Sequence, residues 1–422
     1  MRVLHVGKFY PPVAGGIENF LGDLLPALEK MGVSAAALVH DDPNGGATPD
    51  TGLPRIYWAP CSGTLLYAPV SPMFPKIMAQ AIREFRPDIL HLHVPNTSAF
   101  WALVLPAARK IPWVIHWHAD VISSQIDRRM ALAYQIYRPV ERLFLQHATC
   151  IITTSRAYLD SSPTLARFRN KCRVAPLGLD HHRVDVPTAE DRQWADQVWG
   201  RTGHRILVVG RLTYYKGHDV VLNAMSELPE AKLVVVGDGE RETSLRRQIA
   251  ANGLDDRVRL TGLLPEYRLH ALMATCDCLC LPSIERTEAF GLVLLEAMRF
   301  AKPVVASDIP GSGVGWVVDH GVTGLLVRPG HAGDLAAALH TVLDSPAVKL
   351  HMGQAALDRF YAHFQIDPVA SQIVLAYKGI WGEGSGNRVQ GGRPSTVSTL
   401  SMTSTTSTSI NTQKICQNQP QK

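Results

Sequence analysis

Two glutamates in the second half of the chain stand with seven residues between them. Glu288 and Glu296 both fall in the segment LPSIERTEAFGLVLLEAMRF, residues 281–300. A carboxylate repels phosphate but accepts two O–H hydrogen bonds at once, so it suits the hydroxyls of a sugar or a ribose. One glutamate for each ring would orient a nucleotide-sugar. A capping glutamate followed by a solvated helix glutamate is the alternative interpretation of the same spacing.

Two cations precede them in a glycine-bounded loop. Arg211 and Lys216 lie in GRLTYYKG, residues 210–217, directly after the apolar run 205–209. Two cations with backbone amides suit a diphosphate, and they suit it better when its ester bond breaks and negative charge grows. Two solvated surface cations are the alternative. The sequence has no D-x-D triplet, so a metal-bridged diphosphate is not implied.

The elements around the glutamates would place them at one end of a helix. The apolar run 277–281 predicts a buried strand, and the helical spacing over 290–300 predicts a helix after it. Glu288 would then lie in the loop at the helix N-terminus, and Glu296 about two turns further in. Gly291 has no side chain to cover the free amides of the first turn, which is typical of an anion-binding helix start.

The first half opens with a strand, a glycine loop and a helix. Residues 3–6 form an apolar run, the loop ends in Gly15-Gly16, and apolar residues at helical spacing follow over 17–30. This is the first unit of a Rossmann-like fold, and the two glycines would let a diphosphate approach the helix start. A plain tight turn is the rival interpretation. The motif G-x-G-x-x-G is absent, so a dehydrogenase is a weak alternative.

Short apolar runs alternate with helical patterns through both halves of the chain. This alternation predicts parallel sheets covered by helices, with ligands at the carboxyl ends of the strands. Further strands are predicted at 34–39, 56–59, 88–93, 112–118, 151–154, 173–175, 232–236, 257–260, 303–306 and 324–327. Helices are predicted at 74–85, 97–110, 265–274, 332–343 and 348–363.

Histidines stand at alternate positions near the ends of two predicted strands, as His91 and His93 and as His116 and His118. Such a pair points both rings to one side of a strand, which also suits zinc. No acidic or thiol side chain at a suitable spacing completes a metal site, so none is predicted. His118 is a candidate ligand contact, with a hydrogen-bonded histidine at a domain interface as the alternative.

The segment 125–147 combines four arginines with aromatic and aliphatic residues at helical spacing. Two interpretations remain open. It is either a core helix with one solvated face, or an amphipathic helix that leans on an anionic membrane to reach a lipid-linked acceptor.

Composition and charge restrict the class of protein, the number of domains and the cellular compartment. A chain of 422 residues with 46% hydrophobic and 19% charged residues is an ordinary soluble globular protein of two domains. The net charge of +5 does not argue for nucleic acid. No secretion signal and no run of about 20 apolar residues is visible. Seven cysteines, an odd number, favour a reduced, cytoplasmic protein. If the segment 125–147 contacts a membrane, the protein is expected to be peripheral on the inner face of the cell membrane.

Taken together, the motifs resemble the retaining glycosyltransferases of the GT-B fold (family 4 type). The matching pieces are Gly15-Gly16, His118 in HWHAD, GRLTYYKG, VVVGDGE at 234–240 and the glutamate pair, and they cover residues 1–380 in the family's order. The resemblance implies an α/β fold of two Rossmann-like domains that face each other across a cleft. We expect them at 1–180 and 200–363, with a last helix at 365–381 that crosses back and a disordered tail at 382–422.

The resemblance also implies roles for the singled-out residues. Glu296 would hold the ribose hydroxyls, and Glu288 the donor sugar. Arg211 and Lys216 would neutralise the leaving diphosphate without a metal or a cofactor. The remaining donor contacts would come from the amides of Phe290 and Gly291, from Gly15 and Gly16, and from His118 of the other domain.

The sequences of three segments narrow the expected activity. YYKG, ERTEAFGLVLLEAM and PGSGVGWV most resemble bacterial mannosyl- or rhamnosyltransferases of exopolysaccharide or O-antigen assembly. We expect transfer of a hexose, first of all mannose from GDP-mannose, to a polyprenyl-linked saccharide. A UDP-hexose-dependent enzyme with a soluble acceptor is one alternative. A catalytically silent nucleotide-sugar-binding protein is another.

Overall fold

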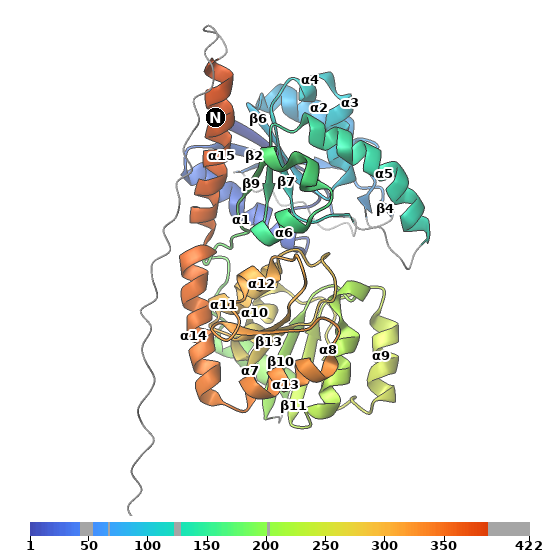
Figure 1. Ribbon diagram of the computed structural model, residues 1–422, viewed down its shortest axis with the longest axis vertical. Coiled ribbons are helices and arrows are strands. Elements are labelled where there is room, and N and C mark those ends of the chain that lie inside the picture. Colours follow the sequence, from blue (N-terminus) through green and yellow to red (C-terminus); the bar gives the residue numbers. More distant parts are fainter. Residues whose placement is uncertain (43–53, 66–67, 122–127, 201–202, 387–422) are drawn as a thin grey trace, which may run out of the picture.

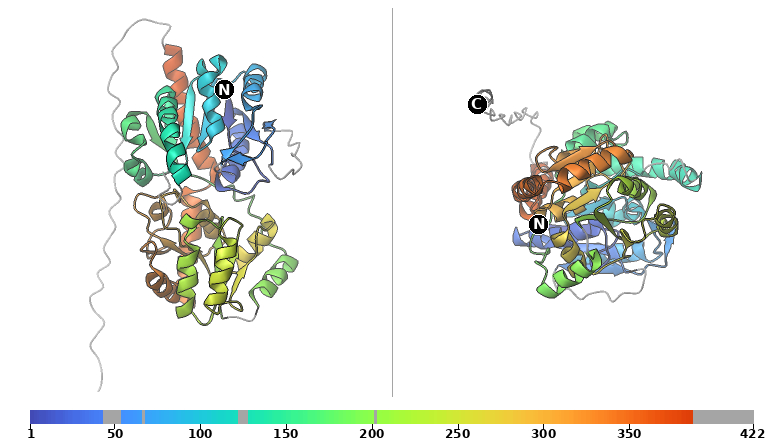
Figure 2. Two further views of the ribbon diagram at one scale, coloured as in Figure 1. Left: turned by 90° about the vertical axis from the view of Figure 1, so that its right-hand side faces the viewer. Right: turned by 90° about the horizontal axis from the view of Figure 1, so that it is seen from below.

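A computed structural model describes residues 1–42, 54–65, 68–121, 128–200 and 203–386. Two α/β units are stacked along the long axis of the molecule, and each consists of a parallel sheet with helices on both faces (Figures 1 and 2). The central strands are short, mainly apolar runs buried on both faces, which is the pattern that a covered parallel sheet requires. Among the described residues, no helix is long and apolar enough to cross a membrane.

The first unit holds a seven-stranded parallel sheet in the order β3-β2-β1-β6-β7-β8-β9. Its strands are β1 (Arg2–Val6), β2 (Ser34–His40), β3 (Arg55–Ala59), β6 (Ile89–Val94), β7 (Trp113–Trp117), β8 (Cys150–Thr153) and β9 (Cys172–Val174). The helices of this unit are α1 (Gly16–Lys30), α2 (Phe74–Phe85), α3 (Trp101–Val104), α4 (Pro106–Arg109), α5 (Arg128–His147) and α6 (Arg156–Ser161), with 3-10 turns η1 (Thr97–Phe100) and η2 (Leu165–Lys171). Strand β4 (Thr64–Leu65) pairs antiparallel with β5 (Ala68–Pro69) in a separate two-stranded sheet.

The second unit holds a six-stranded parallel sheet in the order β12-β11-β10-β13-β14-β15. Its strands are β10 (His204–Val209), β11 (Ala231–Val236), β12 (Val258–Leu260), β13 (Cys278–Leu281), β14 (Val304–Ser307) and β15 (Gly324–Val327). Its helices are α7 (Ala189–Trp199), α8 (His218–Ala224), α9 (Glu242–Ala251), α10 (Glu266–Thr275), α11 (Leu292–Arg299), α12 (Val314–Val317), α13 (Ala332–Leu343) and α14 (Pro346–His363), with 3-10 turns η3 (Tyr214–Lys216) and η4 (Met225–Glu227).

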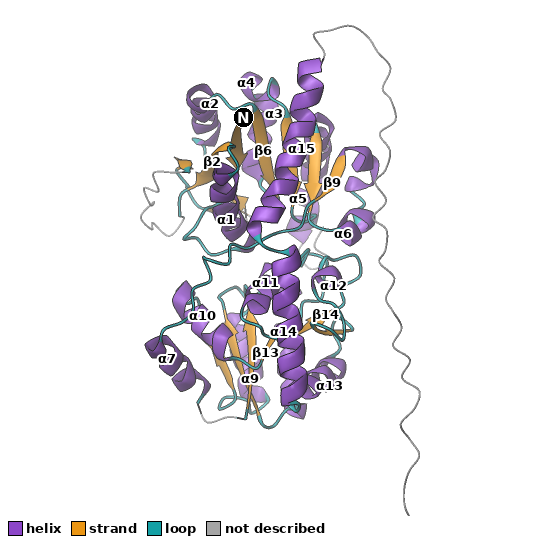
Figure 3. Cartoon of the chain, turned by 90° about the vertical axis from the view of Figure 1, so that its left-hand side faces the viewer, coloured by secondary structure: helices purple, strands orange, loops and turns teal. Residues whose placement is uncertain are grey.

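The last helix, α15 (Ile366–Gly386), returns to the first unit. It packs against α1 and β8, while the preceding α14 packs against α11 of the second unit, so the two helices line one side of the molecule (Figure 3). The largest apolar core accordingly contains residues of both units. The helix runs five residues beyond the predicted end at residue 381. The rest of the predicted tail, 387–422, lies outside the described residues.

One predicted helix, 97–110, is wrong as a single element. The structure divides it into η1, α3 and α4, with Leu105 extended between the last two (φ −79°, ψ 115°). The reason is Pro106, because proline cannot donate to the preceding turn and disfavours a helical conformation in the residue before it.

Candidate active site

The centre of the site is a buried ion pair between the two predicted loops. Lys216, at the end of η3, donates through Nζ to Oε2 of Glu288 at 2.6 Å, and Ser283 donates through Oγ to the same oxygen at 2.9 Å. The lysine and glutamate side chains are only 14% and 10% exposed. Burial acts to lower the pKa of Lys216, but the Glu288 carboxylate and Tyr215 together outweigh it and the pKa is raised. Lys216 therefore stays charged beside Glu288.

The two loops are fixed directly against one another. The amide of Ile284 donates to the carbonyl of Tyr215 at 2.8 Å. Gly217 adopts φ 66°, and a Cβ there would lie 2.0 Å from the carbonyl oxygen of Pro282. Only glycine allows this approach. The loop after β10 can therefore present Lys216 to the loop after β13.

The Glu288 loop is held from its other side by residues 311–313. Ser312 donates through Oγ to the carbonyl of Glu288, and the amide of Gly313 donates to the carbonyl of Ala289 at 2.7 Å. Gly291 caps α11 in the left-handed region at φ 78°. The side chain of Phe290 is buried in the core, so this residue can offer only its backbone to a ligand.

Glu296 pairs with Arg183, a residue that the sequence did not single out. It lies on α11, is 7% exposed, and has Oε1 at 3.7 Å from Nη2 of Arg183. The same guanidinium binds Asp23 of α1 and Glu266 of α10, both at 2.9 Å. Burial raises the pKa of Glu296 to about 7, although Arg183 opposes the shift. The second glutamate thus belongs to an ion network that joins the two units.

Arg211 acts on two groups of the first unit. It is exposed, and its charge acts on the pKa of the half-buried Lys8 and of the buried Glu18. Burial raises the pKa of Glu18, and the cations Lys8 and Arg211 oppose that shift. A third cation and a buried carboxylate therefore stand near the predicted diphosphate site. The signal for Glu18 was its place in the first turn after Gly-Gly, where an acid is favourable.

The predicted glycine pair lies at this same boundary. A Cβ on Gly16 would be 3.6 Å from Cβ of Leu292, the first residue of α11, so the starts of α1 and α11 adjoin. A Cβ on Gly15 would be 2.1 Å from Oε2 of Glu18, so that carboxylate lies over the start of α1. Gly15 and Gly16 are therefore close to the Glu288 loop.

His118 follows β7 and is 4% exposed. Its Nε2 lies 3.0 Å from Nδ1 of His93, and burial, followed by the neighbouring His116 and His93, lowers its pKa well below 6.5. The imidazole is therefore neutral. Two residues further on, Asp120 accepts from Nη2 of Arg286 in the Glu288 loop at 2.9 Å. The segment that carries His118 thus meets the predicted donor loop.

Residues 125–127 of the predicted amphipathic segment lie outside the described residues. The remainder forms α5, in which Phe144 and Leu145 are buried while Arg138, Arg142 and Leu143 are exposed. One face of α5 therefore belongs to the core, and the other carries cations beside an apolar side chain.

Comparison with known proteins agrees with this architecture. The family described as "Glycosyl transferase 4-like domain" matches residues 15–178, and "Glycosyl transferases group 1" matches residues 191–359. The chain is 29% identical to O-antigen chain mannosyltransferase C of Escherichia coli, over 89% of this chain and 98% of the relative. It is 29% identical to the D-rhamnosyltransferase WbpZ of Pseudomonas aeruginosa (85% and 91%) and 30% identical to a glycogen synthase of Mycobacterium tuberculosis (90% and 95%).

Solved structures share the fold. Sucrose-phosphate synthase of Thermosynechococcus elongatus superposes with a TM-score of 0.74 at 22% identity, over 90% of this chain and 99% of that one. HepE of Anabaena, in complex with UDP and glucose, superposes with a TM-score of 0.71 at 23% identity, over 90% and 99%. The predicted α/β fold, two Rossmann-like domains facing across a cleft, is confirmed. The chain belongs to the GT-B glycosyltransferases that carry a glycosyltransferase 4-like domain followed by a group 1 domain.

Proposed function

We propose that the protein is a retaining hexosyltransferase that uses a nucleotide-sugar donor, first of all GDP-mannose, and a lipid-linked saccharide acceptor. The observation that carries the proposal is the buried pair Lys216–Glu288, which sets a phosphate-binding cation beside a hydroxyl-binding carboxylate at the carboxyl ends of β10 and β13. The names of two full-length relatives, an O-antigen mannosyltransferase and a rhamnosyltransferase, favour a deoxyhexose or hexose in polysaccharide assembly.

The donor's diphosphate lies between Arg211 and Lys216, close to the starts of α1 and α11 at Gly15 and Gly16. When Lys216 turns to phosphate, Glu288 exchanges it for hydroxyls of the donor sugar, with help from the amides of Phe290 and Gly291. A carboxylate can accept two such hydrogen bonds. Glu296 accepts from the ribose hydroxyls, and the neighbouring Arg183 favours its ionised form. His118 reaches the donor sugar from the first domain.

Transfer proceeds on one face of the donor sugar. The bond from the anomeric carbon to the phosphate oxygen breaks as the acceptor oxygen bonds to the same carbon, and the acceptor's proton passes to the departing phosphate. Negative charge grows on the diphosphate during this step, so Arg211 and Lys216 act most strongly in the transition state. Configuration is retained without a covalent intermediate.

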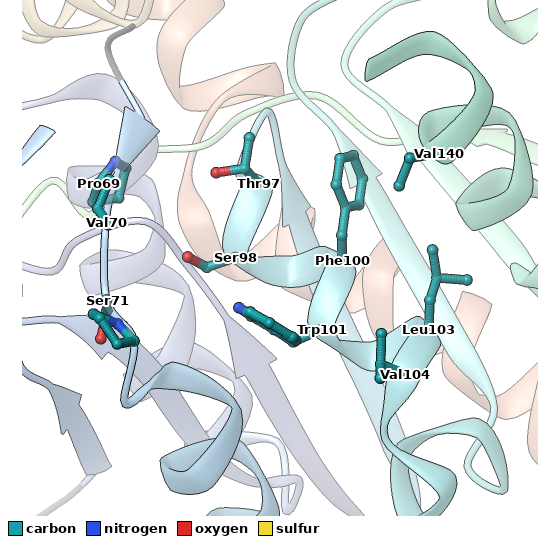
Figure 4. Close-up of a pocket in the computed structure, with 11 residues that line it drawn as sticks. Pro69, Val70, Ser71, Thr97, Ser98, Phe100, Trp101, Leu103, Val104 and Val140 are labelled. Carbon is teal, nitrogen blue, oxygen red and sulfur yellow. The ribbon is translucent and has the colours of Figure 1, made fainter. Parts of the chain in front are cut away.

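An apolar pocket of the first domain favours the proposal of a lipid-linked acceptor. It encloses about 460 Å³ between the chain around Val70 and the helices that follow β6, and it is lined by the side chains drawn in Figure 4. Trp101 and Val104 at this pocket are exposed, and Val140 of α5 contributes to its wall. The exposed Arg138 and Arg142 of α5 lie in the same helix. Apolar side chains beside arginines suit a lipid tail at an anionic membrane surface.

The test begins with donor binding. GDP-mannose, UDP-glucose, UDP-galactose and UDP-GlcNAc are compared by thermal shift, because a donor that binds only the folded protein raises its melting temperature. We expect the largest shift with GDP-mannose. A larger shift with a UDP-hexose would favour the second candidate, since HepE was solved with UDP and glucose. No shift with any donor would contradict the proposal.

Turnover then tests the roles of the cations. The donor is incubated with a polyprenyl-linked saccharide in vesicles, and the anomeric configuration of the product is read by NMR. The double variant Arg211→Ala/Lys216→Ala should lose turnover far more than it loses donor binding. Near-normal turnover in this variant would refute the proposed role. Failure to detect either transfer or donor hydrolysis in the unmodified protein would favour a silent binding protein.

A further inference from the structure

Five buried histidines share one face of the first sheet. His5 of β1 stands opposite His91 of β6, and His93 of β6 stands opposite His116 of β7. Side chains two residues apart on a strand point to the same side. His118 therefore joins this row from the position after β7. The face is covered by α1 and α15, which place Phe20 and Tyr377 against the imidazoles.

Three of the rings form a head-to-tail chain that ends at the candidate active site. Nε2 of His118 lies 3.0 Å from Nδ1 of His93, and Nε2 of His93 lies 3.0 Å from Nδ1 of His5. At the two ends, Nδ1 of His118 and Nε2 of His5 are buried and have no hydrogen-bond partner among the described residues. The remaining rings form a separate chain, in which His116 bonds to His91 and His91 bonds to the hydroxyl of Tyr377.

Ring geometry favours hydrogen bonding over metal binding. Two sets of nitrogen atoms, those of His93, His116 and His118 and those of His5, His91 and His93, lie close enough together to be considered as metal ligands. A ring nitrogen binds a metal along a lone pair that lies in the ring plane. The rings of His116 and His118 are stacked 4.3 Å apart at 4°, and those of His91 and His93 are stacked 4.6 Å apart at 10°. In each set, two lone pairs therefore lie in separate, nearly parallel planes and do not converge. Burial also lowers the pKa of all five rings, which keeps them neutral.

A chain of neutral imidazoles has only two consistent proton arrangements. Each ring carries one N–H and one lone pair. If every Nε2 carries the proton, the unpaired N–H is that of His5, deep in the sheet. If every Nδ1 carries it, the unpaired N–H is that of His118, at the candidate active site. A buried N–H without an acceptor is costlier than an unused lone pair. The second arrangement becomes fully satisfied when a ligand oxygen accepts from His118.

We propose that His93, itself hydrogen-bonded to His5, is a positioning residue that holds the ring of His118 and supplies the N–H that Nε2 of His118 accepts in its Nδ1–H form, so that His118 donates to an oxygen of the donor sugar. This inference rests on the proposed function, because it takes the ligand of His118 to be the nucleotide-sugar. His93 and His5 touch no substrate and act only through His118.

Two amide substitutions at one position test the inference. In His93→Asn the amide occupies the place of Nδ1 and retains a partner for His118. In His93→Gln it occupies the place of Nε2 and retains only the partner for His5. Both variants bury the same polar group, so they match in desolvation. We expect kcat/KM for the donor to stay within about twofold in His93→Asn and to fall roughly tenfold in His93→Gln, the loss typical of one hydrogen bond.

The control is Tyr377→Phe, which removes a buried hydrogen bond from the other histidine chain. It should leave kcat/KM unchanged. Equal losses in His93→Asn and His93→Gln, or a tenfold loss in Tyr377→Phe, would overturn the inference and leave packing as the explanation. Thermal unfolding of each variant shows that it is folded before its kinetics are compared.

Spectra of ¹⁵N-labelled histidine give a readout that packing would not move. Addition of the donor that gives the largest thermal shift should convert His118, His93 and His5 together to the Nδ1–H form. Retention of Nε2–H by His118 in that complex would overturn the inference. If no nucleotide-sugar binds at all, the absent thermal shift identifies the failure as that of the proposed function rather than of the histidine chain.

Discussion

Replacing Lys216 by methionine should destabilise the protein more than removing both charges of its ion pair. Methionine keeps most of the aliphatic stem and removes the ammonium group. Glu288 is then left buried, with the hydroxyl of Ser283 as its remaining partner. In Lys216→Met/Glu288→Gln, the glutamine can still bond to Ser283, and no uncompensated charge remains.

The magnitude follows from burial. Both side chains are at most 14% exposed, so solvent does little to screen the charge that the single substitution leaves behind. Removing one partner of a buried ion pair costs about 3–5 kcal/mol, whereas removing both often costs much less. For a domain of this size, the single variant should melt roughly 10 °C lower. The double variant should recover more than half of that loss.

The assay is thermal and urea unfolding of the protein without donor, with Lys349→Met as a matched control. Lys349 donates to Asp277 at 2.9 Å in the same domain, but these side chains are about a quarter exposed. The control should lose about 1 kcal/mol or less. If Lys216→Met loses no more than the control, or if the double variant loses as much as the single one, the argument from a compensated buried pair fails.

Three further substitutions test the pH dependence of stability and the proposed membrane contact. Burial raises the pKa of Glu296 to about 7 from 4.5, so the folded state retains a proton that the unfolded state releases, and this residue's contribution to stability falls as pH rises between those values. Glutamine does not titrate. In Glu296→Gln, the difference in unfolding free energy between pH 5 and pH 8, measured with urea, should therefore lack the part that Glu296 contributes in the unmodified protein. Burial lowers the pKa of His116 below 6.5, so the unfolded state binds the extra proton and stability falls as pH drops below 6.5. In His116→Gln the slope of the unfolding free energy against pH, measured below pH 6.5, should decrease by the equivalent of up to one proton. Trp101→Glu should weaken sedimentation with anionic vesicles, with donor binding unchanged.

The sequence was sufficient to predict the architecture because its signals are local. Runs such as 233–236 and 303–306 are short and apolar throughout, which is what a strand buried on both faces requires. Several of the predicted runs precede a helical pattern, and this alternation predicted the parallel sheets. The wrong prediction of a single helix at 97–110 also has a local cause, because Pro106 disfavours a helical conformation in Leu105.

Long-range partners could not be predicted in the same way. Glu296 pairs with Arg183, and Arg183 with Asp23, through contacts between segments far apart in the chain. No local period records such a pairing. The histidine row shows the same limit. The spacing of His91 and His93 predicted a shared face, but the contribution of His5 depends on β1 lying beside β6, and strand order is a property of the folded sheet.

The proposed roles imply that phosphate and sugar are recognised together. Lys216 and Glu288 are partners in the protein without a donor, so a donor that binds either group competes with their ion pair. A nucleotide-sugar compensates both, because its phosphate takes the cation while its hydroxyls take the carboxylate. A nucleoside diphosphate compensates only Lys216 and would leave a buried carboxylate without its cation, which is unfavourable. After transfer, the return of Lys216 to Glu288 therefore favours release of the nucleotide product. The Lys216–Glu288 ion pair thus competes with the incoming donor, and it also favours dissociation of the product before the next donor binds.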